Sequence, residues 1–349
     1  MGGKAKNKKY KAINNEEPPT ANYDNPSLFN KTDVLLFLLL TAFSQAIYYL
    51  TMYPSLAGGD SGELMTVAVE FGVAHPPGYP LLTILGFIFN KLLPIGTPVW
   101  RLNTLATIIG GLSNGMIYLV VKNVTNNNPA AVLTALWCAF SRLHWTWSLH
   151  YEVFSLNNLL TGAILLSMVR FSRETTVAGM IRGAKVCAAM CGLAMSNQHT
   201  SILIIAPGAI WVLISLLRHS VTDFKVLASI TLHGFAGLLL YLQFPLSAYI
   251  GTARQFWSHQ TSVIDSLLSL KSHILREHYG TFKLQRADKE ASFSYNLTHW
   301  LTQSSTDFTP VLWVVAVLTA LLSHKLARPV RTVIHVFCAM LGTGLFQFQ

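Results

Sequence analysis

The chain has 349 residues, of which 52% are hydrophobic and only 11% are charged, and its mean hydropathy is +0.42. Soluble globular domains carry about 25% charged residues, so this composition excludes an ordinary soluble domain and indicates a membrane protein. The net charge of +10 does not indicate nucleic-acid binding, because the basic residues are scattered between apolar runs and gather in short loops. That distribution is typical of a topology signal.

The first 32 residues are polar, with five lysines between positions 4 and 11 and no apolar core of the signal-peptide type. This composition predicts a disordered tail over residues 1–32. Positive charge before the first apolar segment places the N-terminus in the cytosol. Contact of these lysines with anionic lipid is a weaker alternative.

Nine segments are apolar and long enough to cross a bilayer, which takes about 20 residues of helix. They are 33–53, 99–121, 129–148, 153–170, 180–196, 200–217, 226–246, 307–324 and 330–346. The sequence therefore predicts an all-α polytopic protein. Residues 80–93 are apolar but short and contain Asn90 and Lys91. We expect a re-entrant or interfacial helix there.

If residues 80–93 do not cross the membrane, most loop lysines and arginines lie on the same side as the N-terminus, as the positive-inside rule requires. The opposite, luminal side then carries two large loops, 54–98 and 247–306. Three N-x-S/T sequons are present, at Asn30, Asn123 and Asn296. Only Asn296 falls in a luminal loop, so it is the expected glycosylation site.

The first luminal loop holds two dense motifs, GGDSGEL (58–64) and AHPPGYP (74–80), and Glu70 lies between them. Ionisable groups at a membrane edge are costly and are usually functional. Asp60, with Glu63 three residues later, also matches a capping box for a helix over 61–72. Capping is therefore the structural alternative to a catalytic role. The chain has no phosphate-loop, HExxH, GxSxG or CxxC motif, and we predict no metal site.

Five blocks of the sequence resemble one protein family: GGDSGEL, AHPPGYPL, EVFSLNN (152–158), SNQHT (196–200) and REHYGTF (276–282). They are similar to the eukaryotic transmembrane protein O-mannosyltransferases that modify IPT domains of plexins and receptor kinases. More distantly, the chain resembles the GT-C superfamily of polyprenol-dependent glycosyltransferases.

The resemblance implies a GT-C membrane module over 33–325 in the endoplasmic reticulum membrane, with 54–98 as its large first luminal loop. Residues 326–349 would be a truncated further span, and the C-terminal luminal domain of the family would be absent. The implied reaction transfers mannose from dolichyl phosphate mannose to Ser or Thr hydroxyls of luminal proteins, with inversion and without a cofactor.

An alcohol is a poor nucleophile, so a carboxylate must accept its proton while cations stabilise the departing phosphate. Asp60 matches the first acidic position of the family motif and is the predicted base, with Glu63 beside it. The predicted donor-phosphate ligands are His75, Arg101 and Arg254. The residues predicted to line the surrounding cavity are Glu70, Tyr79, Glu152, Asn197 and His199.

Two other functions fit the composition. A lipid or solute transporter would also carry ionisable groups within the membrane. A transporter would distribute them along several spans, whereas here they map to one face, which favours a one-sided enzyme. An inactive, truncated scaffold is the second alternative.

Overall fold

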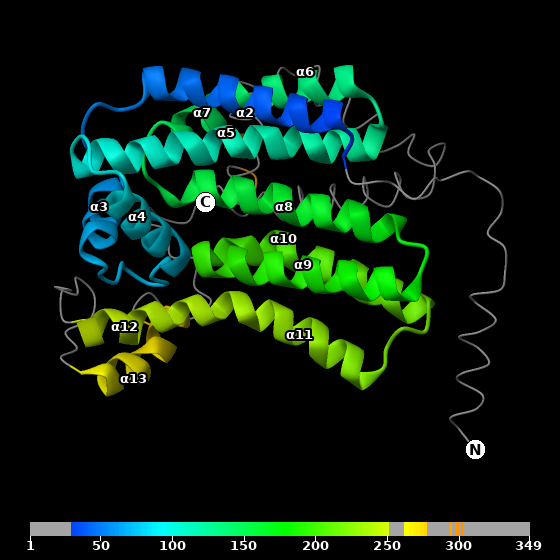
Figure 1. Ribbon diagram of the computed structural model, residues 1–349. Helices are drawn as coiled ribbons and strands as arrows, with labels where there is room; N and C mark the ends of the chain where they lie inside the picture. The colour runs from blue at the N-terminus through cyan, green and yellow to red at the C-terminus, as the bar shows by residue number, and fades with distance from the viewer. Residues whose placement is uncertain (1–28, 251–261, 278–293, 295–297, 300–301, 303–349) are drawn as a thin grey trace.

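The computed structural model describes residues 29–250, 262–277, 294, 298–299 and 302. Within this part of the chain every regular element is a helix, as predicted (Figure 1). Two predicted spans (307–324 and 330–346), Arg254 and Asn296 lie outside the described residues.

Six helical segments of the described chain are long and apolar enough to cross a membrane. Each coincides with a predicted span, and the chain is a multi-pass membrane protein. Four are single helices: α2 (Lys31–Thr51), α5 (Pro98–Thr125), α8 (Val153–Arg173) and α9 (Val177–Asn197). The fifth joins η1 (His199–Ser201) to α10 (Ile202–Arg218), and the sixth consists of α11 (Phe224–Leu238), η2 (Leu239–Leu242) and α12 (Gln243–Ile250).

The predicted single span over 129–148 is wrong, because the segment is divided into α6 (Asn128–Ala139) and α7 (Arg142–Ser148). At the break, the buried Tyr48 hydroxyl donates to the Ala139 carbonyl at 2.7 Å, and the Ser141 hydroxyl donates to the Cys138 carbonyl at 2.9 Å. The bond from Tyr48 satisfies a carbonyl group that the helix end leaves without a helical partner.

Two short helices, α3 (Ser61–Glu70) and α4 (Pro80–Leu92), pack together at one end of the bundle, which we call the α3 end (Figure 1). The 13 residues of α4 reach about 20 Å, which is too short for a bilayer core of about 30 Å. The short apolar helix expected at 80–93 is thus confirmed. Its depth in the membrane remains a prediction.

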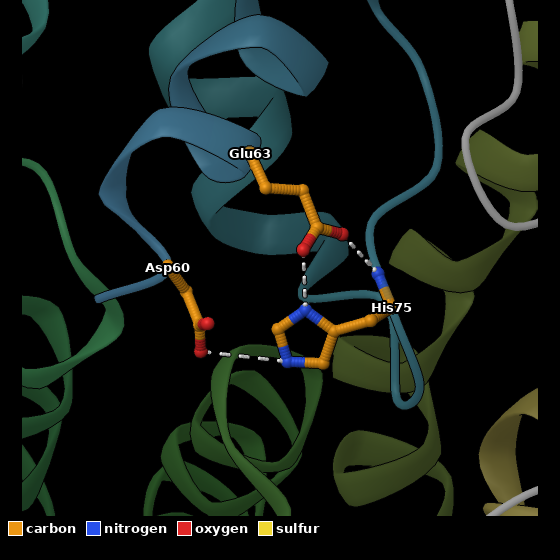
Figure 2. A group of neighbouring side chains, drawn as sticks. All are labelled: Asp60, Glu63 and His75. Carbon is orange, nitrogen blue, oxygen red and sulfur yellow. Dashed lines mark hydrogen bonds and ion pairs between the residues drawn. The ribbon is translucent and has the colours of Figure 1, made fainter. Parts of the chain in front are cut away.

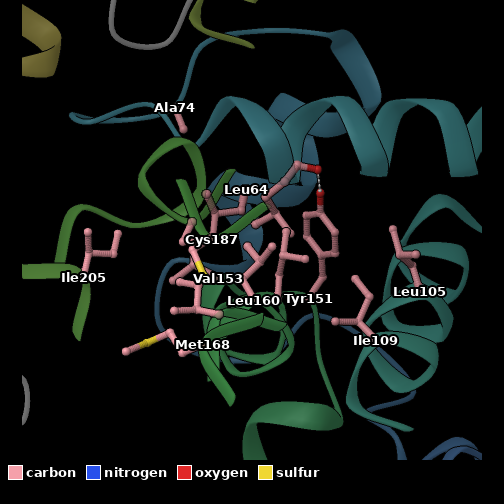
Figure 3. Packing of buried hydrophobic residues seen from close by; sticks show 14 of the residues in the cluster. Leu64, Ala74, Leu105, Ile109, Tyr151, Val153, Leu160, Met168, Cys187 and Ile205 are labelled. Carbon is pink, nitrogen blue, oxygen red and sulfur yellow. Dashed lines mark hydrogen bonds between the residues drawn. The ribbon is translucent and has the colours of Figure 1, made fainter. Parts of the chain in front are cut away.

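Buried polar contacts fix the segments around α3. Asn103 at the start of α5 accepts from the Tyr151 backbone N–H (3.1 Å) and donates to the Tyr53 carbonyl (2.9 Å). The Tyr151 hydroxyl donates to the Leu82 carbonyl of α4 at 2.6 Å. Figure 3 shows Tyr151 among the apolar side chains of the main core, to which Leu64 of α3 also belongs. The segment before α8 is therefore hydrogen-bonded to α4 and shares an apolar core with α3.

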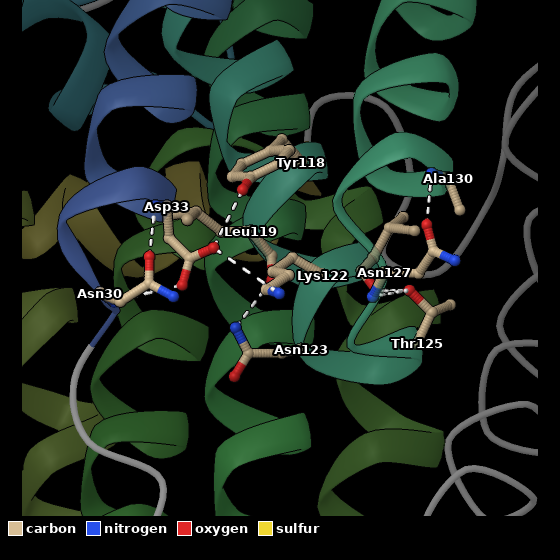
Figure 4. A network of polar contacts seen from close by, with 10 residues as sticks. Asn30, Asp33, Tyr118, Leu119, Lys122, Asn123, Thr125, Asn127 and Ala130 are labelled. Carbon is tan, nitrogen blue, oxygen red and sulfur yellow. Dashed lines mark hydrogen bonds and ion pairs between the residues drawn. The ribbon is translucent and has the colours of Figure 1, made fainter.

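A second polar network fixes the opposite end of the bundle (Figure 4). Asn30 and Asp33 form a capping box at the start of α2. The buried Asp33 carboxylate accepts from the Tyr118 hydroxyl at 3.1 Å and lies 3.8 Å from the Lys122 ammonium of α5. Asn30 and Asn123, the two sequons predicted to share the cytosolic side, both lie at this end.

Two glycines of the short helices give a matched test of this packing. A Cβ at Gly86 of α4 would meet the Tyr151 hydroxyl and lie 2.8 Å from the Ala68 Cβ, whereas a Cβ at Gly62 of α3 meets no described atom within 4 Å. Gly86→Ala should therefore cost about 1–3 kcal/mol through overpacking. Gly62→Ala should be neutral or stabilise by up to about 1 kcal/mol. Thermal unfolding in detergent measures both, and equal effects would contradict the packing.

Candidate active site

Asp60 lies at the N-terminus of α3, directly after Gly59, whose φ of 72° is in the left-handed region that favours glycine. In the described structure the Asp60 carboxylate makes no capping hydrogen bond. The side chain of Glu63 reaches a different segment altogether. The capping-box alternative is therefore wrong here.

Glu63 binds His75 twice, as Figure 2 shows. One carboxylate oxygen accepts from the His75 backbone N–H at 2.8 Å, and the other lies 3.0 Å from Nδ1 of its ring. On the other side of the ring, Nε2 lies 2.9 Å from the Tyr79 hydroxyl and 3.8 Å from the Asp60 carboxylate. The two motifs of the first loop thus meet in one polar cluster.

A tight turn returns the chain from His75 to Tyr79. The Gly78 N–H donates to the His75 carbonyl at 2.7 Å, and both Gly78 (φ 97°) and Tyr79 (φ 44°) are left-handed. This turn aims the Tyr79 hydroxyl at the His75 ring. Pro80 then begins α4 at a position that proline favours.

The charges of this cluster favour a protonated His75. Burial acts to lower the His75 pKa, but the hydrogen bond and negative charge of Glu63, with the charge of Asp60, outweigh it and raise the pKa above its usual value. Burial also raises the pKa of Tyr79, which keeps this phenol in its neutral form. The site therefore biases His75 toward its imidazolium form beside the Glu63 and Asp60 carboxylates.

Glu152 adds a carboxylate of a different kind. It precedes α8, is only 4% exposed, and accepts hydrogen bonds from the backbone N–H groups of Val153 and Asp60. Burial, followed by the charge of Asp60, raises its pKa from 4.5 to about 7. The Asp60 side chain, by contrast, is 62% exposed. Two neighbouring carboxylates therefore sit in opposite environments, an arrangement typical of acid–base sites.

Two of the predicted cavity residues, Asn197 and His199, lie at the end of α9 and in η1. The Asn197 amide donates to the Val153 carbonyl at 3.1 Å, which ties the end of α9 to the start of α8. His199 Nε2 lies 2.8 Å from the Tyr241 hydroxyl of η2. Tyr241 was not predicted from the sequence, because it lies inside an apolar span and follows no recognisable motif.

Arg276 is a second residue that sequence reasoning did not assign to the site. It follows α13 (Val263–Ile274), and its positive charge acts on the pKa values of both His75 and Tyr79. His273 of α13 fixes this segment, with Nε2 3.1 Å from the Ala74 carbonyl. The REHYGTF block was the available signal, since Arg276 begins it.

Two predicted residues are not joined to the cluster by any described contact. The Arg101 guanidinium donates to the carbonyls of Asn90 (3.1 Å), Ile95 (2.9 Å) and Gly96 (3.0 Å), and so closes the connection between α4 and α5. Glu70 ends α3, about 15 Å along the helix axis from Asp60. A phosphate-binding role for Arg101 and a cavity role for Glu70 stay predictions.

Asp60, Glu63 and His75 each offer one possible metal-ligand atom, a carboxylate oxygen or a ring nitrogen. These three atoms lie within 4.8 Å of one another, a spacing that could accommodate a metal ion. The His75 ring, however, is already held by Glu63 through Nδ1 and by Tyr79 at Nε2. These contacts give Glu63 and His75 a role that requires no ion. The absence of a metal from the chemistry stays a prediction.

The raised pKa of Glu152 makes a testable contribution to stability. Between pH 4.5 and about 7 the folded chain holds a proton that the unfolded chain releases, so raising the pH favours unfolding. Glu152→Gln removes this dependence, and its stability relative to the parent should rise with pH by at most about 3 kcal/mol. Thermal unfolding at pH 5 and pH 8 measures the change. The exposed Glu174, at the other end of α8, supplies the control Glu174→Gln, and an equal pH response in both variants would contradict the assignment.

Comparisons with known proteins identify the family of the chain. Residues 60–222 match the family model described as the protein O-mannosyl-transferase TMEM260 N-terminal domain. The chain is 36% identical over 296 residues to protein O-mannosyl-transferase TMEM260 of Mus musculus, covering 85% of this chain and 42% of the mouse protein. It is 34% identical over 272 residues to the Dictyostelium discoideum protein of the same name. That match covers 75% of this chain and 33% of the Dictyostelium protein.

Among solved structures, the fold is similar to the S. cerevisiae protein O-mannosyltransferase Pmt1-Pmt2 complex bound to the sugar donor. The TM-score is 0.50 at 16% identity, covering 64% of this chain and 34% of that chain, and this likeness concerns the fold alone. The chain spans less than half the length of the curated relatives it matches. Over the region compared, the chain belongs to the TMEM260 family of protein O-mannosyl-transferases.

Proposed function

We propose that the chain transfers mannose from dolichyl phosphate mannose to Ser or Thr hydroxyls of secretory-pathway proteins, IPT domains among them. The observation that carries this proposal is the polar cluster of Asp60, Glu63, His75 and Glu152 at the α3 end of a membrane bundle. The family match begins at Asp60 itself. On this proposal the α3 end faces the lumen of the endoplasmic reticulum, and the N-terminus is cytosolic.

Asp60 is the proposed base because it is the most exposed carboxylate of the cluster and can meet an acceptor that arrives from water. The acceptor oxygen attacks the anomeric carbon of mannose as its proton passes to Asp60. The bond between that carbon and the phosphate oxygen breaks, and its electrons leave with dolichyl phosphate. One such displacement inverts the anomeric configuration.

The departing phosphate gains negative charge, which a fixed cation stabilises more strongly than it stabilises the ground state. His75 supplies this cation on our proposal, because Glu63 favours its protonated form and Tyr79 fixes its ring. Arg276 adds positive charge close enough to act on both His75 and Tyr79. Glu152 holds the backbone of Asp60 and so sets the position of the base.

The transporter alternative receives less support. The carboxylates and the histidine of the cluster gather at the α3 end, while the buried Asp33 and Lys122 form a separate pair at the opposite end. A transport path would need ionisable groups between these two ends. A one-sided enzyme accounts for the distribution directly.

The transfer assay on Asp60→Asn tests the proposal. Asn removes the proton acceptor while keeping the shape of the side chain, so transfer of labelled mannose should fall at least about a hundredfold. Asp223→Asn is a matched control, because Asp223 also occupies a helix N-cap position without a side-chain capping bond. The control should transfer mannose within a few fold of the parent. Parental activity in Asp60→Asn would remove Asp60 from the chemistry and direct attention to Glu152.

A further inference from the structure

Helix α13 places a buried imidazole, that of His273, against the loop between α3 and α4. The residue is only 2% exposed, and its Nε2 lies 3.1 Å from the Ala74 carbonyl, 199 residues away in the sequence. A carbonyl oxygen accepts hydrogen bonds and cannot donate them, so Nε2 carries the proton. His273 lies outside the five blocks that resemble the family. The proposed reaction therefore leaves this side chain without a role of its own.

The Ala74 carbonyl and the His75 N–H belong to one peptide unit, and both groups are bound. The Glu63 carboxylate accepts from the N–H at 2.8 Å (Figure 2), while His273 donates to the carbonyl. Because a peptide unit is planar and trans, these two groups point to opposite sides of it. The unit is therefore held from one side by α3 and from the other by α13.

The two hydrogen bonds on this peptide unit strengthen each other. A donor at the carbonyl polarises the amide, which makes the His75 N–H a better donor to Glu63. The second oxygen of the same carboxylate lies 3.0 Å from Nδ1 of the His75 ring. The placement of the carboxylate beside the ring therefore depends on the peptide that lies between them. Loss of the donor at His273 should loosen both contacts of Glu63.

Packing against α12 fixes the His273 ring. Phe244 meets this ring edge-on, with the ring centroids 5.1 Å apart and the ring planes at 90°. The same phenyl ring lies against Gly78, where an added Cβ would overlap it. The neighbouring Gln243 amide donates to the Gly72 carbonyl at 2.7 Å. Helices α12 and α13 thus contact the loop on both sides of His75.

The described groups that act on the His75 ring or contact it come from several elements: Asp60 and Glu63 of α3, Tyr79 before α4, Glu152 before α8 and Arg276 after α13. Of these groups, Glu63 contributes most to the protonated form of His75. Glu63 is also bound to the peptide unit that His273 holds. A change at His273 should therefore reach the His75 ring through Glu63.

We propose that His273 is a positioning residue of the transferase, which holds the Ala74–His75 peptide unit against Glu63 and so keeps the His75 ring beside the Glu63 carboxylate. The role of His75 toward the phosphate rests on the proposed function, whereas the hold of His273 on His75 does not. His273 acts through His75 and does not itself touch the reacting atoms on this proposal.

The protonation of His75 can be measured without mannosyl transfer. Diethyl pyrocarbonate modifies the neutral imidazole, so the pH dependence of His75 modification, followed by mass spectrometry of the purified full chain, gives the His75 pKa. His273→Phe keeps the ring packing against Phe244 but removes the donor. Because Glu63 then raises the His75 pKa less, the midpoint should move to lower pH by about half a unit. His273→Gln carries an amide donor and should restore the parental midpoint.

His219 supplies the matched control. It follows α10, is exposed, and its Nδ1 lies 2.8 Å from the Ser215 carbonyl. His219→Phe therefore removes the same kind of bond from an imidazole to a carbonyl, away from the cluster, and should leave the His75 midpoint unchanged. An equal shift in His219→Phe, or a parental midpoint in His273→Phe, would overturn the proposal.

A double substitution tests the route through Glu63. In Glu63→Gln the carboxylate on which His273 acts is gone, so adding His273→Phe should shift the His75 midpoint no further. If the two shifts simply add, His273 acts on His75 by a different route, and the proposed hold through Glu63 is wrong.

Melting temperature separates positioning from folding. His273→Phe should melt close to the parent, and His273→Leu, a second variant without a donor, should give the same shift at His75. Failure of both variants to fold would make His273 a structural residue and would overturn the proposal.

Transfer of labelled mannose gives the final readout. It should fall in His273→Phe and recover in His273→Gln. Parental transfer despite a shifted His75 midpoint would remove His273 from the reaction. If the midpoint shifts as expected but the parent transfers no mannose, the proposed function fails while the hold of His273 on His75 stands.

Discussion

The contact between Glu63 and His75 holds the candidate site together. One carboxylate binds the backbone and the ring of the same residue, so α3 and the turn before α4 become a single unit. Charge-assisted hydrogen bonds of this kind are among the stronger ones in proteins. Residues distant in the sequence also form hydrogen bonds with this unit. The Gln243 amide donates to the Gly72 carbonyl at 2.7 Å, and His273 binds the Ala74 carbonyl. The position of the His75 ring depends on both sets of contacts.

The same arrangement divides electrostatic roles between neighbouring groups. Asp60 is exposed and negative, His75 is biased toward its cation, and Glu152 is buried with a pKa raised to about 7. Their environments, more than their residue types, create the differences. A reaction that moves one proton and releases one phosphate needs this separation of base and cation.

The sequence predicted local features well and distant contacts poorly. Windows of apolar residues identified six spans, because a bilayer imposes a length on every helix that crosses it. Asp60, Glu63, His75 and Tyr79 lie within twenty residues, so their clustering followed from two motifs. The break between α6 and α7 depends on Tyr48, 91 residues away from the carbonyl that it binds. Tyr241 and Arg276 likewise reach the site only through helix packing, which no local pattern encodes.

The pH dependence of mannosyl transfer tests the central claim most directly, because it reports the state of His75 during the reaction. Rate as kcat/KM should fall at alkaline pH as His75 loses its proton. Glu63→Gln removes the hydrogen bond and charge that raise the His75 pKa, so this alkaline fall should move to lower pH. Glu174→Gln makes the same change at the far end of α8, outside the cluster, and should leave the profile unchanged. An alkaline limb that stays in place in Glu63→Gln would contradict the account.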